Sequence, residues 1–102
     1  MSFERISIYK IRLSKRTTKF LSKLDKNTAT RILDKIESLK ADPYRSPGVK
    51  QLTGKLEGLY RLRIGNYRAV YEVNEKGHII IVLIVGPRGD IYSKVYCNEI
   101  IG

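Results

Sequence analysis

A tight β-hairpin at the centre of the chain is the feature that most constrains its fold. Residues 58–73 read GLYRLRIGNYRAVYEV, and apolar and polar side chains alternate on both sides of Gly65 and Asn66. Alternation with period two is typical of strands with one buried face, and glycine in the first position of a two-residue loop is what a type II′ turn requires. This turn would set the register of the hairpin and place Arg63 directly opposite Arg68.

The patterns before and after this hairpin predict an α+β fold. In chain order, the expected elements are a strand at 7–13, helices at 15–24 and 29–39, and strands at 59–64, 67–74 and 79–85. We predict a single domain, residues 1–102, in which an N-terminal strand and a helical hairpin precede a three-strand antiparallel meander. The helices would cover one face of the sheet and leave the other free. Residues 42–58 are rich in turn formers and form a connection, and residues 90–101 fit a strand or a short helix.

The charge of the chain is unusual for its size. Twenty Lys and Arg against ten Asp and Glu give a net charge of +10. Such an excess repels itself in the folded state, which favours a polyanionic partner such as RNA, DNA, an anionic membrane or an acidic protein; the alternative is a generic solubilising surface. The basic side chains of the two helices, including Arg31 and Lys35, are interpreted as a solvated face.

Several function classes are not expected from the composition. One cysteine, Cys97, excludes an internal disulfide and fits a reducing cytoplasm, and one Cys with one His offers no zinc-ligand spacing. We expect no signal peptide and no membrane span, because the longest apolar run, 79–85, is far too short. No metal and no cofactor is expected, and no paired-carboxylate or Ser/His/Asp pattern is present.

Three arginines would share one face of the predicted hairpin. Arg61 and Arg63 point away from the apolar side of their strand, and the register places Arg68 on the same face. Like charges opposed across strands destabilise a sheet, so the arrangement favours a phosphate-binding function, where guanidinium groups offset charge that develops in a transition state. The alternative is that all three are solvated strand-edge residues.

The segment GPRGDIY, residues 86–92, supplies further candidates. Arg88 follows the last predicted strand and can join the arginines, while the phenol of Tyr92 can transfer a proton or stack on a base. Tyr92 as a core aromatic is the competing interpretation. The only histidine, His78, is expected to be exposed and uninvolved.

Three segments of the chain together resemble a known toxin superfamily. YKIRLSKRTTKFLSKL, KQLTGKLEGLYRLRIGNYRAVYEV and IVLIVGPRGDIY, spanning Tyr9 to Tyr92, are similar to the RelE/ParE superfamily and most like its archaeal RelE-type mRNA interferase toxins. The resemblance implies a RelE-like, microbial-ribonuclease-like fold and the toxin half of a type II toxin-antitoxin system. Such a toxin enters the ribosomal A site and cleaves mRNA by attack of a ribose 2′-hydroxyl on the adjacent phosphate, which inhibits translation.

The resemblance also implies which residues act and where this chain departs from the family. The implied catalytic residues are Arg61, Arg63, Arg68, Arg88 and Tyr92. Two of these arginines replace family lysines, and an arginine cannot act as a base as a lysine can. The spacing from the last arginine to the tyrosine is two residues shorter than in the best-known bacterial members, which makes Tyr96 a substitute. The Glu/His pair of the YoeB-like branch has no clear counterpart.

The partners implied by the resemblance are mRNA on the ribosome and an acidic RelB-like antitoxin, with operator DNA bound only through the toxin-antitoxin complex. Two alternatives stay open on the sequence. The first is a ParE-like toxin that poisons DNA gyrase without nuclease activity. The second is a non-catalytic nucleic-acid-binding module that uses its arginines only for phosphate contacts.

Overall fold

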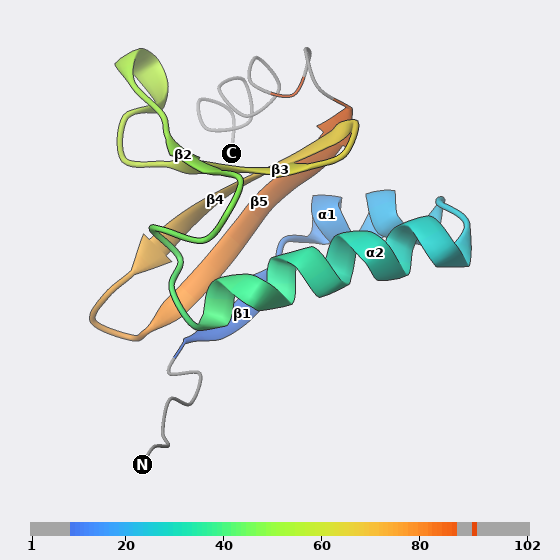
Figure 1. Ribbon diagram of the computed structural model, residues 1–102, viewed down its shortest axis with the longest axis horizontal. Helices are drawn as coiled ribbons and strands as arrows, with labels where there is room; N and C mark the ends of the chain where they lie inside the picture. Colours follow the sequence, from blue (N-terminus) through green and yellow to red (C-terminus); the bar gives the residue numbers. More distant parts are fainter. Residues whose placement is uncertain (1–8, 88–90, 92–102) are drawn as a thin grey trace.

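The structure, a computed structural model, describes residues 9–87 and residue 91 as a sheet with helices on one side (Figure 1). Its elements are β1 (Lys10–Leu13), α1 (Lys15–Ser22), α2 (Lys26–Glu37), η1 (Ser38–Lys40), β2 (Val49–Gln51), η2 (Gly54–Leu56), β3 (Tyr60–Ile64), β4 (Tyr67–Asn74) and β5 (Ile79–Pro87). The predicted α+β class and the order of strand, helical hairpin and meander are confirmed.

The sheet contains one more strand than the sequence predicted. The strand order is β1-β5-β4-β3-β2, in which β3, β4 and β5 form the expected antiparallel meander. The strand β1 pairs in parallel with β5, and β2 pairs antiparallel with β3 inside the segment predicted as a connection. Three residues are too few to show a period, which is why β2 escaped prediction. The strand β5 also runs two residues further than expected, to Pro87.

Ser14 joins the first helix to the sheet. Its hydroxyl accepts the Thr17 N–H at 3.0 Å, which caps α1, and donates to the Leu83 carbonyl at 2.8 Å. Leu83 is the extra residue of a β-bulge in β5, since β4 skips it in the pairing register. The bulge therefore turns a carbonyl toward the start of α1, and the predicted cap at Ser14 also fixes the helix on the strand.

The second helix begins where the sequence DKN was predicted to break the first. The Asp25 carboxylate accepts the Thr28 N–H at 3.1 Å and caps α2. The Thr28 hydroxyl also donates to this carboxylate at 2.6 Å, and the two hydrogen bonds, that from the hydroxyl first, lower the pKa of Asp25. Ile32 and Ile36 on this helix, followed by Leu39 in η1, are buried at helical spacing against the sheet.

Both faces of the sheet carry apolar clusters. The larger cluster lies between the sheet and the helices and includes Leu62 and Tyr71, and the smaller cluster on the opposite face includes Val70, Ile84 and Ile91. Ile91 is only 1 % exposed. The face predicted to be free is therefore covered in part, because Ile91 packs there against Val70 of β4 and Ile84 of β5. The remainder of that face holds the charged residues described next.

Candidate functional site

The β3–β4 hairpin has the turn and register that the sequence predicted. Gly65 has a φ of +59°, and the only non-glycine residue with positive φ in the described part of the chain is His78. A positive φ at the first loop residue alone is the pattern of a type II′ turn. Arg63 is paired with Arg68, and Arg61 is paired with Val70, so the three arginines share one face.

A fourth cation lies on the same face. Lys50 of β2 is the register partner of Arg61, and residues directly opposed in a ladder point to the same side. We call this surface the basic face; its members are Lys50, Arg61, Arg63 and Arg68. It lies on the side of the sheet away from the helices, because Leu62 between the arginines is buried on the helix side. Sequence reasoning missed Lys50 because nothing in the sequence indicated β2.

The arginine side chains are held to different degrees. Arg68 is half-buried, and its Nη1 donates to the carbonyls of Gly65 at 3.0 Å and Tyr67 at 2.9 Å, which fixes the guanidinium over the turn. The Nε of Arg61 is buried without a hydrogen-bond partner among the described residues. A buried donor left in this way costs about 1–3 kcal/mol, unless a ligand supplies the acceptor. Arg63 is exposed.

Three of the four cations of the basic face have no counter-charge among the described residues. Lys50, Arg61 and Arg63 make no side-chain hydrogen bond or salt bridge to the described residues. Directly opposed like charges destabilise a hairpin by roughly 0.2–1 kcal/mol. A surface that concentrates positive charge on a stiff pair of strands suits phosphate oxygens, which accept bidentate hydrogen bonds from guanidinium groups.

The last two predicted site residues cannot be placed on this face. Arg88 and Tyr92 lie outside the described residues, as do Tyr96 and Cys97. Their roles stay predictions. Gly86, two residues before Arg88, is the register partner of Arg68, so β5 leads toward the basic face.

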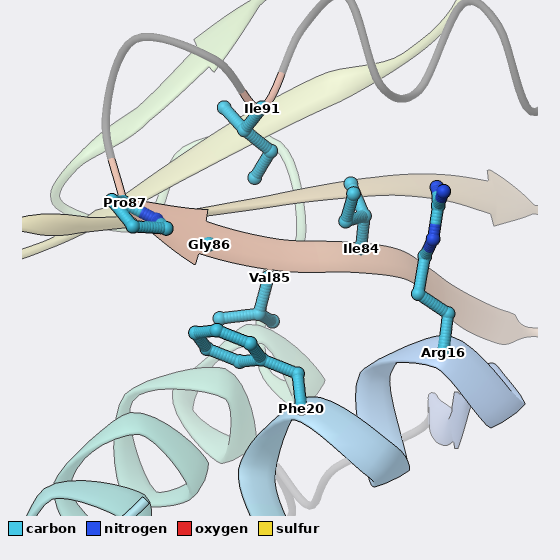
Figure 2. Close-up of a pocket in the computed structure, with 7 residues that line it drawn as sticks. All are labelled: Arg16, Phe20, Ile84, Val85, Gly86, Pro87 and Ile91. Atoms are coloured by element: carbon cyan, nitrogen blue, oxygen red, sulfur yellow. The ribbon is translucent and has the colours of Figure 1, made fainter. Parts of the chain in front are cut away.

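A pocket of about 320 Å³ lies beside this end of β5 (Figure 2). Its lining residues are Arg16, Phe20, Ile84, Val85, Gly86, Pro87 and Ile91. Figure 2 shows Ile84 and Ile91 on one side of the strand, with Val85 and Phe20 on the other. The strand edge is open here because β1 ends at Leu13, opposite Val82, and no other described strand continues it. The same open edge accommodates Pro87, which has no N–H to donate to a further strand.

His78 lies in the loop between β4 and β5, at the opposite end of these strands from the β3–β4 turn. It is exposed, as predicted, and its ring meets Tyr9 edge-on at 5.5 Å between centroids. Tyr9 donates a hydrogen bond to the Glu75 carboxylate at 2.7 Å, and Tyr44 donates a second one. These bonds lower the pKa of Glu75, that from Tyr44 first. The cluster joins three chain segments and lies away from the basic face.

No group of three or more His, Cys, Asp or Glu side chains that could hold a metal ion occurs among residues 9–87 and 91. Likewise, none of the helices in the described part of the chain is long and apolar enough to cross a membrane.

A match to a family model identifies the class of protein. The model described as the ParE toxin of the type II toxin-antitoxin system, parDE, matches residues 11–92. The chain belongs to the RelE/ParE toxin superfamily. The predicted resemblance is thereby confirmed, and the protein is the toxin of a type II toxin-antitoxin system. No curated protein matches the chain.

Solved structures of RelE toxins share the fold. The archaeal RelE–RelB complex from Pyrococcus horikoshii has a chain 35% identical to this toxin, with a TM-score of 0.68 over 79% of this chain and 96% of that one. The RelBE2 complex from Mycobacterium tuberculosis gives 25% identity and a TM-score of 0.70, covering 78% of this chain and 98% of that one. The isolated RelE toxin from E. coli is 22% identical, with a TM-score of 0.66 over 89% of this chain and 98% of that one. At this identity the match supports the shared fold and nothing further.

Proposed function

We propose that this RelE/ParE toxin is an endoribonuclease that cleaves mRNA in the ribosomal A site. The observation that most supports this proposal is the basic face, where three arginines and a lysine from the neighbouring strands β2, β3 and β4 lie on one side of the sheet. A toxin that acts only by binding a protein surface has no need to oppose Arg63 and Arg68 across a hairpin. A nuclease needs such an arrangement, because negative charge grows on the phosphate during cleavage.

In the proposed reaction the ribose 2′-oxygen attacks the adjacent phosphorus and the bond from phosphorus to the 5′-oxygen breaks. The 2′-hydroxyl loses its proton, and the leaving 5′-oxygen gains one, which yields a cyclic phosphate and a 5′-hydroxyl. Arg68, fixed over the turn, and Arg61, with its buried Nε, would donate hydrogen bonds to the phosphate oxygens.

Proton transfer needs a group that titrates more readily than arginine. Lys50 adds an amine on the basic face, and the candidates from the sequence are Tyr92 or a group of the ribosome. We therefore propose that Arg61, Arg63 and Arg68 stabilise charge, while Tyr92 or Lys50 exchanges the proton.

The proposed partners follow from the same system class. The Pyrococcus horikoshii toxin was solved as a RelE–RelB complex. We propose that an acidic RelB-like antitoxin neutralises this chain, since a net charge of +10 favours an acidic partner, and that operator DNA is bound through the complex. The ribosomal target would place its action in the cytoplasm.

A direct test is controlled expression of the toxin in cells, followed by mapping of mRNA ends. The proposal predicts arrested translation and truncated messages whose ends fall at a fixed position within codons. Double-strand DNA breaks together with intact messages would instead identify a gyrase poison of the ParE kind. Intact messages and intact DNA, with RNA binding alone, would identify a non-catalytic module.

A further inference from the structure

A second basic surface adjoins the basic face at the edge of the sheet. It is a groove of about 570 Å³ between α2, the start of β2 and the β3–β4 turn. Its lining residues are Arg31, Lys35, Pro47, Gly48, Arg63, Ile64 and Gly65. Three of these seven residues are cations. Two of the three, Arg31 and Lys35, lie on α2, whose basic side chains the sequence analysis interpreted as a solvated face.

The groove depends on glycine at two positions. Gly65 has a φ of +59°, which residues with a Cβ rarely adopt, and a Cβ built there would stand 3.6 Å from Nη2 of Arg31, so this guanidinium lies against the turn. Gly48 has a φ of +89° and its carbonyl accepts the Arg63 N–H at 3.0 Å. A Cβ at Gly48 would meet the Arg63 carbonyl at 3.2 Å, so a larger residue would disturb this wall of the groove.

The cations of the groove have no counter-charge in the described part of the chain. Arg31, Lys35 and Arg63 make no side-chain hydrogen bond or salt bridge to residues 9–87 or 91. None of the seven lining residues is acidic, and Ile64, one of the few apolar ones, is buried in the sheet. The chemistry fits a phosphate group.

We propose that this groove binds a phosphate of the RNA strand next to the nucleotides held on the basic face. Arg63 is common to both surfaces, so the two form one continuous track from Arg68 across the hairpin to Arg31 and Lys35. The RNA bends around the edge of the sheet at the turn. This inference rests on the proposed RNA substrate and adds a second phosphate contact beside the basic face.

The test compares two double variants that each remove two positive charges. Arg31→Gln/Lys35→Gln alters the groove, and Lys19→Gln/Lys26→Gln alters two exposed lysines, one in α1 and one in α2, that line neither surface. Each protein is titrated with a labelled 2′-O-methyl RNA, which lacks the attacking hydroxyl, over a range of salt concentrations. Thermal melts establish that both variants fold.

The groove variant is expected to lose about 0.7 from the slope of log affinity against log salt, the value for one phosphate contact on a single strand, and the control variant much less. Equal slopes in the two variants would overturn the proposal. So would a groove variant that keeps its RNA slope but loses affinity for polyglutamate, because the groove would then be a site for acidic peptide.

The proposed function fails separately from this inference. RNA binding is measured without ribosomes and without cleavage, so a wild-type toxin that leaves cellular messages intact refutes the nuclease alone. A toxin that cuts messages but shows no difference between the double variants refutes the groove alone.

Discussion

Arg63 and Arg68 are directly opposed residues of one two-residue-loop hairpin, and both side chains lie on the face away from the helices. The type II′ turn at Gly65 fixes the pairing register of β3 and β4, and so fixes which residues face each other. Like charges directly opposed in a hairpin are expected to cost the fold stability, which makes stability and activity separable in experiments.

Arg63→Thr is expected to raise stability while lowering mRNA cleavage. Removal of one of two opposed charges should raise the free energy of unfolding by up to about 1 kcal/mol, and threonine suits a strand. Urea denaturation measures the gain. Arg63→Lys keeps the charge and serves as the control, for which no gain is expected. A loss of stability in Arg63→Thr would show that the opposed charges do not repel appreciably.

Arg68→Ala is expected to lower the cleavage rate by about 10²-fold or more, because its guanidinium is the one the fold already holds in place. Translation reactions with a defined message, followed by primer extension, give the rate. Lys23→Ala, an exposed residue between the helices, is the control. Near-normal cleavage by Arg68→Ala would remove this residue from the site.

Lys50→Gln is expected to reduce cleavage because it takes a cation from beside Arg61. If Lys50 also exchanges the proton, Lys50→Arg restores the charge but not the rate, and the pH profile changes. Lys76→Gln, in the β4–β5 loop at the far end of the sheet, is the matched control. Full rescue by arginine would limit Lys50 to a phosphate contact.

Acid is expected to destabilise the fold through Glu75. Hydrogen bonds from Tyr44 and Tyr9 lower its pKa in the folded state, so its contribution is present above the unfolded pKa and is lost as pH falls through the lower folded value. Thermal melts between neutral and acidic pH should show a shallower acid decline for Glu75→Gln than for wild type. Glu57→Gln, which removes a carboxylate without a described hydrogen bond, is the comparison. Parallel declines in all three proteins would contradict the role of Glu75.

The hairpin was predictable because its determinants are local. Gly65 and Asn66 specify the turn, the turn specifies the register, and the register brings the arginines together. The cap at Ser14 is local in the same way and was predicted with the start of α1. The second helix begins at Lys26, three residues before the predicted start, because the cap at Asp25 was not predicted.

The remaining features depend on contacts between distant segments. The strand β2 exists only because β3 offers an edge, so Lys50 could not be placed from three residues of sequence. The position of Arg31 against Gly65 depends on how α2 packs on the sheet. The burial of Ile91 required knowledge of where the chain goes after β5, which the ambiguous pattern of residues 90–101 did not give.

The Nε of Arg61, buried without a hydrogen-bond partner among the described residues, has a consequence for the behaviour of the purified toxin. An oxyanion that satisfies this donor binds the native chain and not the unfolded one, so native protein accumulates by mass action as the oxyanion is added. Melting temperature measured in phosphate or sulfate buffer should therefore exceed that measured in chloride at equal ionic strength. Arg61→Leu should abolish the difference between the buffers, and the choice of buffer during purification thus decides how much folded toxin is recovered.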